Sequence, residues 1–124
     1  MPTYLAVAIG GALGAFSRYL VDRFIEAREF GVFPWSTFTI NVSGCFLVGV
    51  VIAALVDRHN APGWLRVGLV MGLLGGYTTF STFSQETLDL FEEGRIATAM
   101  SYALGSVAIG LCAVLIGSRV GRVL

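Results

Sequence analysis

Four long apolar stretches constrain the fold of this chain more than any other feature of its sequence. A bilayer hydrocarbon core of about 30 Å requires about 20 consecutive apolar residues in each helix that crosses it. The chain is 56% hydrophobic and 13% charged, and a mean hydropathy of +0.80 leaves a soluble domain too little polar surface. We therefore expect an all-α membrane protein with a single domain over residues 1–124 and the lipid bilayer as its solvent. Its four transmembrane helices are expected at residues 2–21, 37–56, 64–91 and 96–118.

The arginines do not favour one orientation of these helices in the membrane. The sequence contains no lysine, and its arginines divide evenly between the two ends of the expected bundle. The side of both termini carries Arg58, Arg66, Arg119 and Arg122, and the opposite side carries Arg18, Arg23, Arg28 and Arg95. Because the side richer in Lys and Arg normally stays in the cytoplasm, this division predicts insertion in both orientations. Two such copies can form an antiparallel, two-fold homodimer, unless the division is even by chance.

The third apolar stretch is too long for one crossing and is polar in its middle. As a single helix from Trp64 to Phe91 it would extend roughly 42 Å, which exceeds the thickness of the core. At its centre the sequence GGYTTFSTFSQE combines two helix-weakening glycines with a run of hydroxyl groups. We expect a break near Gly75–Thr79, with freed carbonyls at Gly75 and Thr78 able to bind a small hard cation on the two-fold axis. A kink satisfied by Ser and Thr side chains is the alternative interpretation.

Two phenylalanines follow the expected break on one face of the helix. Phe80 and Phe83 are three residues apart, which places them side by side. The edge of an aromatic ring carries partial positive charge, so a ring edge next to hydroxyl donors can accept a small, partly dehydrated anion. Paired phenylalanines also occur as ordinary core residues, and both interpretations remain open at this point.

Polar residues on the other three expected helices are candidates for the same path. Asn41 lies within the second apolar stretch, where an amide needs either a partner across an interface or a pore. Tyr102 and Ser106 share one face of the fourth stretch by their spacing of four residues. Arg18 closes the first stretch, where it can extend toward the headgroups or attract anions into an aqueous vestibule. Interhelical hydrogen bonds are the alternative explanation for the amide and the hydroxyls.

The chain resembles the Fluc-type (CrcB-like) family of small fluoride ion channels over essentially its whole length. The resemblance is carried by GGALGAFSRY from Gly10, TFTINVSGCFLVG from Thr37 and, most specifically, GGYTTFSTFSQE from Gly75. It implies a dual-topology homodimer with two pores, which exports cytoplasmic fluoride passively and selectively across a bacterial inner membrane. It also implies a structural Na⁺ at the centre of the dimer.

The resemblance further assigns roles to individual residues. It places three residues on the fluoride path: Asn41, Phe80 and Phe83. It adds a polar track of Ser81, Thr82, Tyr102 and Ser106, with Arg18 near the aqueous entrance. It gives the Na⁺ ligands as the backbone carbonyls of Gly75 and Thr78. This sequence departs from the family's usual residues at two positions. Ser36 stands where the family often has glycine, and Gly110 stands where some relatives carry serine.

Other functional classes fit the sequence less well. A small dual-topology proton-coupled multidrug transporter is the main alternative, but it needs an acid deep in the membrane, and we expect all the acids at loops or span ends. An enzyme is not expected, because the single histidine, His59, lies in a loop without a nucleophile beside it. Scattered single arginines offer no surface for nucleic acid. A purely structural packing protein would not require the polar, glycine-broken middle of the third stretch.

Overall fold

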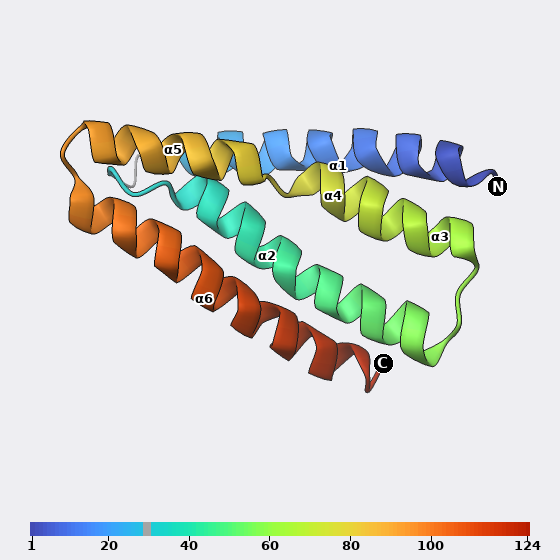
Figure 1. Ribbon diagram of the computed structural model, residues 1–124. Helices are drawn as coiled ribbons and strands as arrows, with labels where there is room; N and C mark the ends of the chain where they lie inside the picture. The colour runs from blue at the N-terminus through green and yellow to red at the C-terminus, as the bar shows by residue number, and fades with distance from the viewer. Residues whose placement is uncertain (29–30) are drawn as a thin grey trace.

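The computed structural model describes residues 1–28 and 31–124, and these residues form helices joined by short connections, without a β-strand (Figure 1). The all-α class is thereby confirmed. In chain order the elements are α1 (Thr3–Glu26), α2 (Trp35–Val51), the wider π-helical segment η1 (Ile52–Arg58), α3 (Gly63–Val67), a second π-helical segment η2 (Gly68–Leu74), α4 (Gly75–Tyr77), α5 (Phe80–Glu92) and α6 (Ile96–Gly121).

Three of the described helices are long and apolar enough to cross a membrane. They are Thr3–Glu26, Trp35–Arg58 and Ile96–Gly121, and they correspond to the first, second and fourth expected spans. Each of them extends beyond its expected C-terminal end by two to five residues, because polar residues continue the helix past the apolar run. The third expected span is not one helix: it consists of two helical pieces, residues 63–77 and Phe80–Glu92.

The break in the third span falls at two threonines. Thr78 (φ −84°, ψ 161°) and Thr79 (φ −149°, ψ 122°) both have extended backbone between α4 and α5. The expected break near Gly75–Thr79 is therefore confirmed, although Gly75 itself keeps helical angles (φ −64°, ψ −36°). Extended conformation suits β-branched residues, and the two glycines stand at the end of the preceding helix instead.

Glycines bring α1 and the first half of the third span into close contact. A Cβ atom at Gly10 would lie 2.4 Å from the Gly68 carbonyl oxygen, and one at Gly14 would lie 2.1 Å from the Leu73 carbonyl oxygen. Such distances leave no room for a side chain. Gly10 and Gly14 therefore form a packing face on α1.

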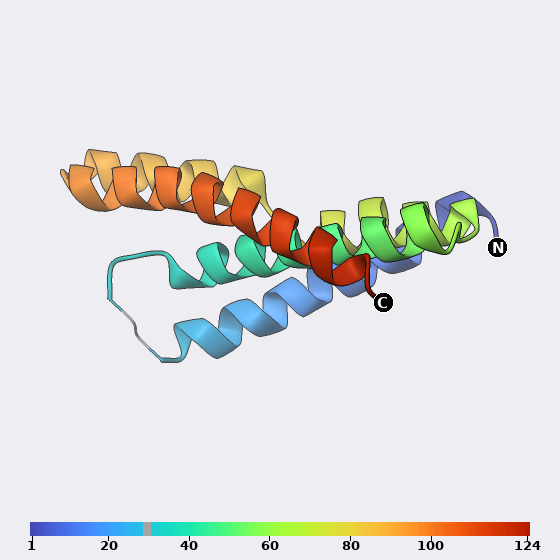
Figure 2. The ribbon, with the colours of Figure 1, turned by 90° about the horizontal axis from the view of Figure 1, so that it is seen from below.

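The second close helix pair is α2 with α6, and it too depends on glycine. A Cβ atom at Gly117 would lie 2.1 Å from the Phe46 carbonyl oxygen, and one at Gly49 would lie 2.4 Å from that of Val114. Figure 2 shows that α1 and α5 diverge toward the end of the bundle opposite the two chain termini. The break in the third span lies where this divergence begins.

Candidate functional site

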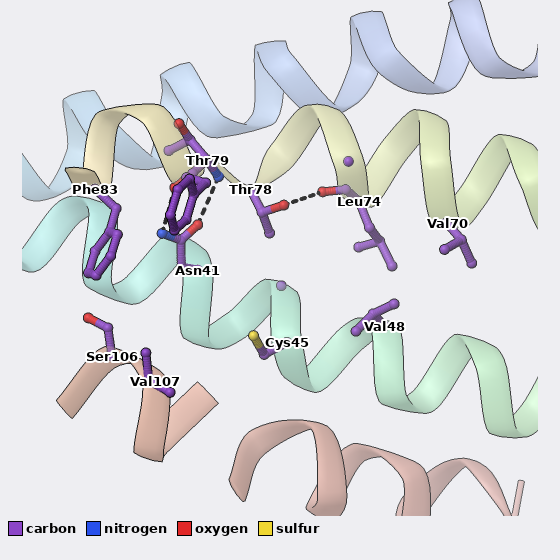
Figure 3. A pocket seen from close by; sticks show the side chains of 13 residues that line it. Asn41, Cys45, Val48, Val70, Leu74, Thr78, Thr79, Phe83, Ser106 and Val107 are labelled. Carbon is purple, nitrogen blue, oxygen red and sulfur yellow. Dashed lines mark hydrogen bonds between the residues drawn. The ribbon is translucent and has the colours of Figure 1, made fainter. Parts of the chain in front are cut away.

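An open cavity of about 370 Å³ lies beside the break, between α2, the third span and α6 (Figure 3). The predicted site residues on its wall are Asn41, Gly75, Thr78, Phe80, Phe83 and Ser106. Of the described residues that line the cavity, none is charged. The chain thus places one amide, two aromatic rings, hydroxyl groups and freed backbone around a single uncharged space.

The amide of Asn41 binds the backbone of the unwound segment. Its Nδ2 donates to the Thr79 carbonyl oxygen at 2.9 Å, and its Oδ1 accepts from the Thr79 N–H at 2.8 Å (Figure 3). Both interactions join α2 to the break. A carboxamide carries two N–H groups, and within the described residues only one of those of Asn41 has a partner.

The hydroxyl groups at the break satisfy the helix ends. The Thr78 Oγ1 donates to the Leu74 carbonyl oxygen at 2.9 Å, on the helix before the break. The Thr79 Oγ1 accepts from the Thr82 N–H at 3.3 Å and donates to the Thr82 Oγ1 at 3.1 Å, which caps the start of α5. For these hydroxyls the alternative of a Ser/Thr-satisfied kink is correct.

The carbonyls of Gly75 and Thr78 are in a different position. In a continuous α-helix the Gly75 carbonyl would accept from the Thr79 N–H, but that group is bonded to Asn41. Among the described residues, no side chain and no backbone group outside the helices donates to the carbonyl of Gly75 or Thr78. Their place as cation ligands stays a prediction.

Phe80 and Phe83 form an aromatic pair at the mouth of the cavity. Their ring centroids are 5.8 Å apart with an interplanar angle of 40°. Phe83 is half-buried and packs on Tyr102 at 5.1 Å, whereas 79% of Phe80 is exposed on the surface of the single chain. Phe83 thus serves both as a core residue and as a wall of the cavity.

Ser106 supplies a buried hydroxyl with no protein partner. Its Oγ is inaccessible to solvent and has no hydrogen bond within the described part of the chain. The side chain points toward Phe83 on the wall of the cavity (Figure 3). Leaving a buried hydroxyl unsatisfied costs about 1–3 kcal/mol.

Tyr102, the predicted track residue of α6 that precedes Ser106 by one turn, does not line this cavity. It is completely buried, and its hydroxyl donates to the Glu86 Oε2 at 2.7 Å. Thr37 donates to the Glu86 Oε1 at 2.7 Å. Our sequence reasoning missed this network. The one available signal was that Glu86 follows Phe83 by three residues, because its hydrogen-bond partners are distant in sequence.

Arg18 and Thr82 line a second cavity of about 300 Å³, on the side of the break that faces α1. Asp22, Thr37 and Thr79 also contribute to its wall, so Thr79 lies between the two cavities. Ser81 is exposed on α5 and lines neither of them. The predicted track is therefore divided: the structure groups Ser106 with the phenylalanines, and Thr82 with the arginine.

The departure at Ser36 has a structural counterpart. Its hydroxyl donates to the carboxylate of Asp22, which ties the start of α2 to the end of α1. At the other departure, a Cβ atom on Gly110 would lie 3.3 Å from the Cys45 Sγ. A larger residue at position 110 would therefore have to displace that thiol.

Comparison with known proteins gives one consistent result. A family model described as CrcB-like protein, Camphor Resistance (CrcB), matches residues 5–118. The fluoride-specific ion channel FluC of Acidobacterium capsulatum is 48% identical over 121 residues, covering 96% of this chain and 95% of that protein. The protein of the same name from Paracoccus denitrificans is 46% identical over 123 residues, covering 97% and 94% of the two chains. This chain therefore belongs to the CrcB family.

Proposed function

We propose that this chain is the subunit of a passive, fluoride-selective ion channel that exports cytoplasmic fluoride down its electrochemical gradient. Relatives that match it over nearly their whole length are named fluoride-specific ion channels. The observation that carries the proposal is the uncharged cavity at the break, whose wall includes Phe80, Phe83, Asn41 and Ser106, the last with a hydroxyl that has no partner in the described part of the chain. These groups suit an anion without offering a cation that would trap it.

Selectivity follows from the kind of donor on the wall. Fluoride gives up its water in stages, and hydroxyl groups, the Asn41 N–H and the edges of Phe80 and Phe83 replace it. Each replacement is a single donor or a partial charge, so the ion stays weakly enough bound to leave. A narrow path past these groups would disfavour the larger chloride ion.

We propose that two copies assemble as an antiparallel homodimer with two pores, each chain a single domain of residues 1–124 with four crossings. The even distribution of arginines supports insertion in both orientations. The exposed ring of Phe80 and the exposed backbone of Gly75 support a partner at the break, because a second copy would cover both. We place this multi-pass protein in the inner membrane of a bacterium.

The free carbonyls at the break fit a structural Na⁺ ion. Uncharged backbone oxygens are suitable ligands for a hard monovalent cation, and the carbonyls of Gly75 and Thr78 lack other donors among the described residues. Two antiparallel copies would contribute the same pair from each side. When bound, the ion would supply positive charge that holds the two unwound segments together.

No comparable observation supports a proton-coupled transporter or an enzyme. Glu86 lies within α5 rather than at a span end, which corrects our expectation for the acids of the chain. Both of its carboxylate oxygens accept hydrogen bonds, from Thr37 and Tyr102, and Glu86 does not line the cavity at the break. A proton-coupled transporter needs such an acid in contact with its substrate. The relatives, moreover, are named as ion channels and not as enzymes.

The test is fluoride efflux from liposomes that hold the purified protein, recorded with a fluoride electrode and with chloride as the control anion. We expect rapid fluoride release without chloride release, and loss of fluoride release in the double variant Phe80→Met/Asn41→Asp. The matched control is Leu104→Met, which alters an exposed residue of α6 and should leave efflux unchanged. Absence of fluoride release from correctly folded protein would refute the channel.

A further inference from the structure

The Asn41 side chain accepts a hydrogen bond that a backbone carbonyl of the third span would accept in a continuous helix. In an uninterrupted helix the Thr79 N–H would donate to the carbonyl of Gly75, four residues earlier. In this structure the same N–H donates to the Asn41 Oδ1 at 2.8 Å. The Asn41 Nδ2 donates in turn to the Thr79 carbonyl at 2.9 Å. One side chain from α2 thus engages the donor that would otherwise close the helix.

The helix ladder is regular up to the residue that Asn41 binds. The N–H of Thr78 still donates to the Leu74 carbonyl at 3.0 Å, as in a helix. Gly75 also keeps helical angles, so glycine alone does not open the chain. The ladder stops at Thr79, whose backbone pairs with the amide on both its N–H and its C=O. The position of the break coincides with the position of this amide.

Gly44 allows α2 to come this close. A Cβ atom at Gly44 would lie 2.2 Å from the Thr78 Cγ2, so the backbone of α2 packs directly on the Thr78 methyl of the unwound segment. Gly44 is three residues after Asn41 and therefore on the same face of α2. The approach of the helix and the bond made by the amide are parts of one contact.

We infer that Asn41 is a positioning residue for the cation site, because it keeps the Gly75 carbonyl free to bind Na⁺. The inference rests on the proposed function and its Na⁺ ion, and it adds a second role for a residue on the wall of the fluoride path. Without an acceptor at position 41, the Thr79 N–H can return to the Gly75 carbonyl and compete with the ion. The amide thereby links the fluoride path to the cation at the break.

Two variants at position 41 separate this role from a direct contact with fluoride. Asn41→Leu removes the acceptor and the donor and keeps the branched shape of the side chain. Asn41→Asp keeps an acceptor for the Thr79 N–H but loses the donor. Ser43→Ala is the matched control, because it removes another hydrogen bond between α2 and the third span, the one between Ser43 and Tyr77 at 2.9 Å.

The experiment is a titration of the purified protein with Na⁺, with N-methyl-D-glucamine as the replacement cation and thermal unfolding in detergent as the readout. A restored backbone hydrogen bond has a net worth near 1 kcal/mol, so Asn41→Leu should raise the Na⁺ concentration for half-maximal stabilisation by about fivefold. Asn41→Asp and Ser43→Ala should stay within about twofold of the unmodified chain. An unchanged midpoint in Asn41→Leu, or absence of Na⁺ stabilisation in the unmodified protein, would overturn the inference.

A second variant covers the case in which Asn41→Leu does not fold. Asn41→Ala removes the same acceptor with a smaller side chain, so the Thr79 N–H is again able to return to the Gly75 carbonyl. The Na⁺ midpoint should rise in this protein as in Asn41→Leu, and an unchanged midpoint would overturn the inference. Fluoride efflux measured on the same preparations distinguishes the two proposals, since failed efflux with an intact Na⁺ response refutes the channel alone.

Discussion

Replacing Gly44 with alanine should push the unwound segment out of position. The added Cβ would lie 2.2 Å from the Thr78 Cγ2, whereas carbon atoms in contact are about 3.5 Å apart. The shortfall is about 1.3 Å. Thr78 cannot simply rotate away, because its hydroxyl donates to the Leu74 carbonyl. The α2 backbone cannot easily retreat, because Asn41 binds Thr79 on two sides.

We expect Gly44→Ala to lower the free energy of unfolding by about 1–3 kcal/mol, the usual cost of an overpacked contact. Fluoride efflux should fall as well, since Thr78 and its neighbours form the wall of the cavity. The rescuing change is Thr78→Ser, which deletes the Cγ2 methyl and keeps the hydroxyl. The double variant should come within about 1 kcal/mol of Thr78→Ser alone.

The free energy of unfolding is measured by SDS titration of the purified protein in mixed micelles. Fluoride efflux from liposomes is measured on the same variants. Gly105→Ala in α6 is the control, because apart from the neighbouring backbone of its own helix no described atom lies within 4 Å of its added Cβ. It should be neutral or stabilising, since alanine is the better helix former. If Gly44→Ala matches this control, or if Thr78→Ser does not rescue it, the contact between α2 and the break has been misjudged.

Three further predictions use the same two assays. Gly14→Ala should lower the free energy of unfolding by more than about 3 kcal/mol, because its Cβ would lie 2.1 Å from a backbone oxygen that no side-chain rotation can move. A stability equal to that of Gly105→Ala would contradict this. Ser106→Ala removes a buried hydroxyl with no partner and should gain up to about 1 kcal/mol of stability while fluoride efflux falls. Unchanged efflux would remove that hydroxyl from the path. Tyr102→Phe leaves one Glu86 oxygen without its 2.7 Å donor and should lower the free energy of unfolding by about 1–3 kcal/mol. An unchanged stability would show that water replaces the phenol.

The sequence was sufficient to predict the spans and the position of the break, because both depend on local composition. Apolar length located three continuous helices, and the hydroxyl-rich centre located the interruption in the third span. The cause of the break was less predictable. Gly75 and Gly76 were the apparent weak points, yet the unwound residues are Thr78 and Thr79, which bind a side chain 38 residues away. Local helix propensity contains no information about such a partner.

The predicted site residues were separated by contacts that spacing cannot reveal. Tyr102 and Ser106 share a helix face, but the phenol binds Glu86 in the core while the hydroxyl of Ser106 lies on the cavity wall. Which part of a face meets a cavity depends on how the helix is rotated against its neighbours. The bond from Thr37 to Glu86 spans 49 residues of sequence and shows the same limitation.

The helices contact one another through different groups at the two ends of the molecule. Toward the chain termini the helices meet through glycines, as at Gly117 against a backbone oxygen of α2, and such contacts have no adjustable side chain. Toward the other end, hydrogen bonds from Thr37 and Tyr102 to Glu86 join α2, α5 and α6. The break lies where one kind of contact gives way to the other. Substitutions at the glycines should therefore change assembly and conduction together, whereas polar substitutions beside the break, such as Ser106→Ala, can change conduction in a protein that still folds.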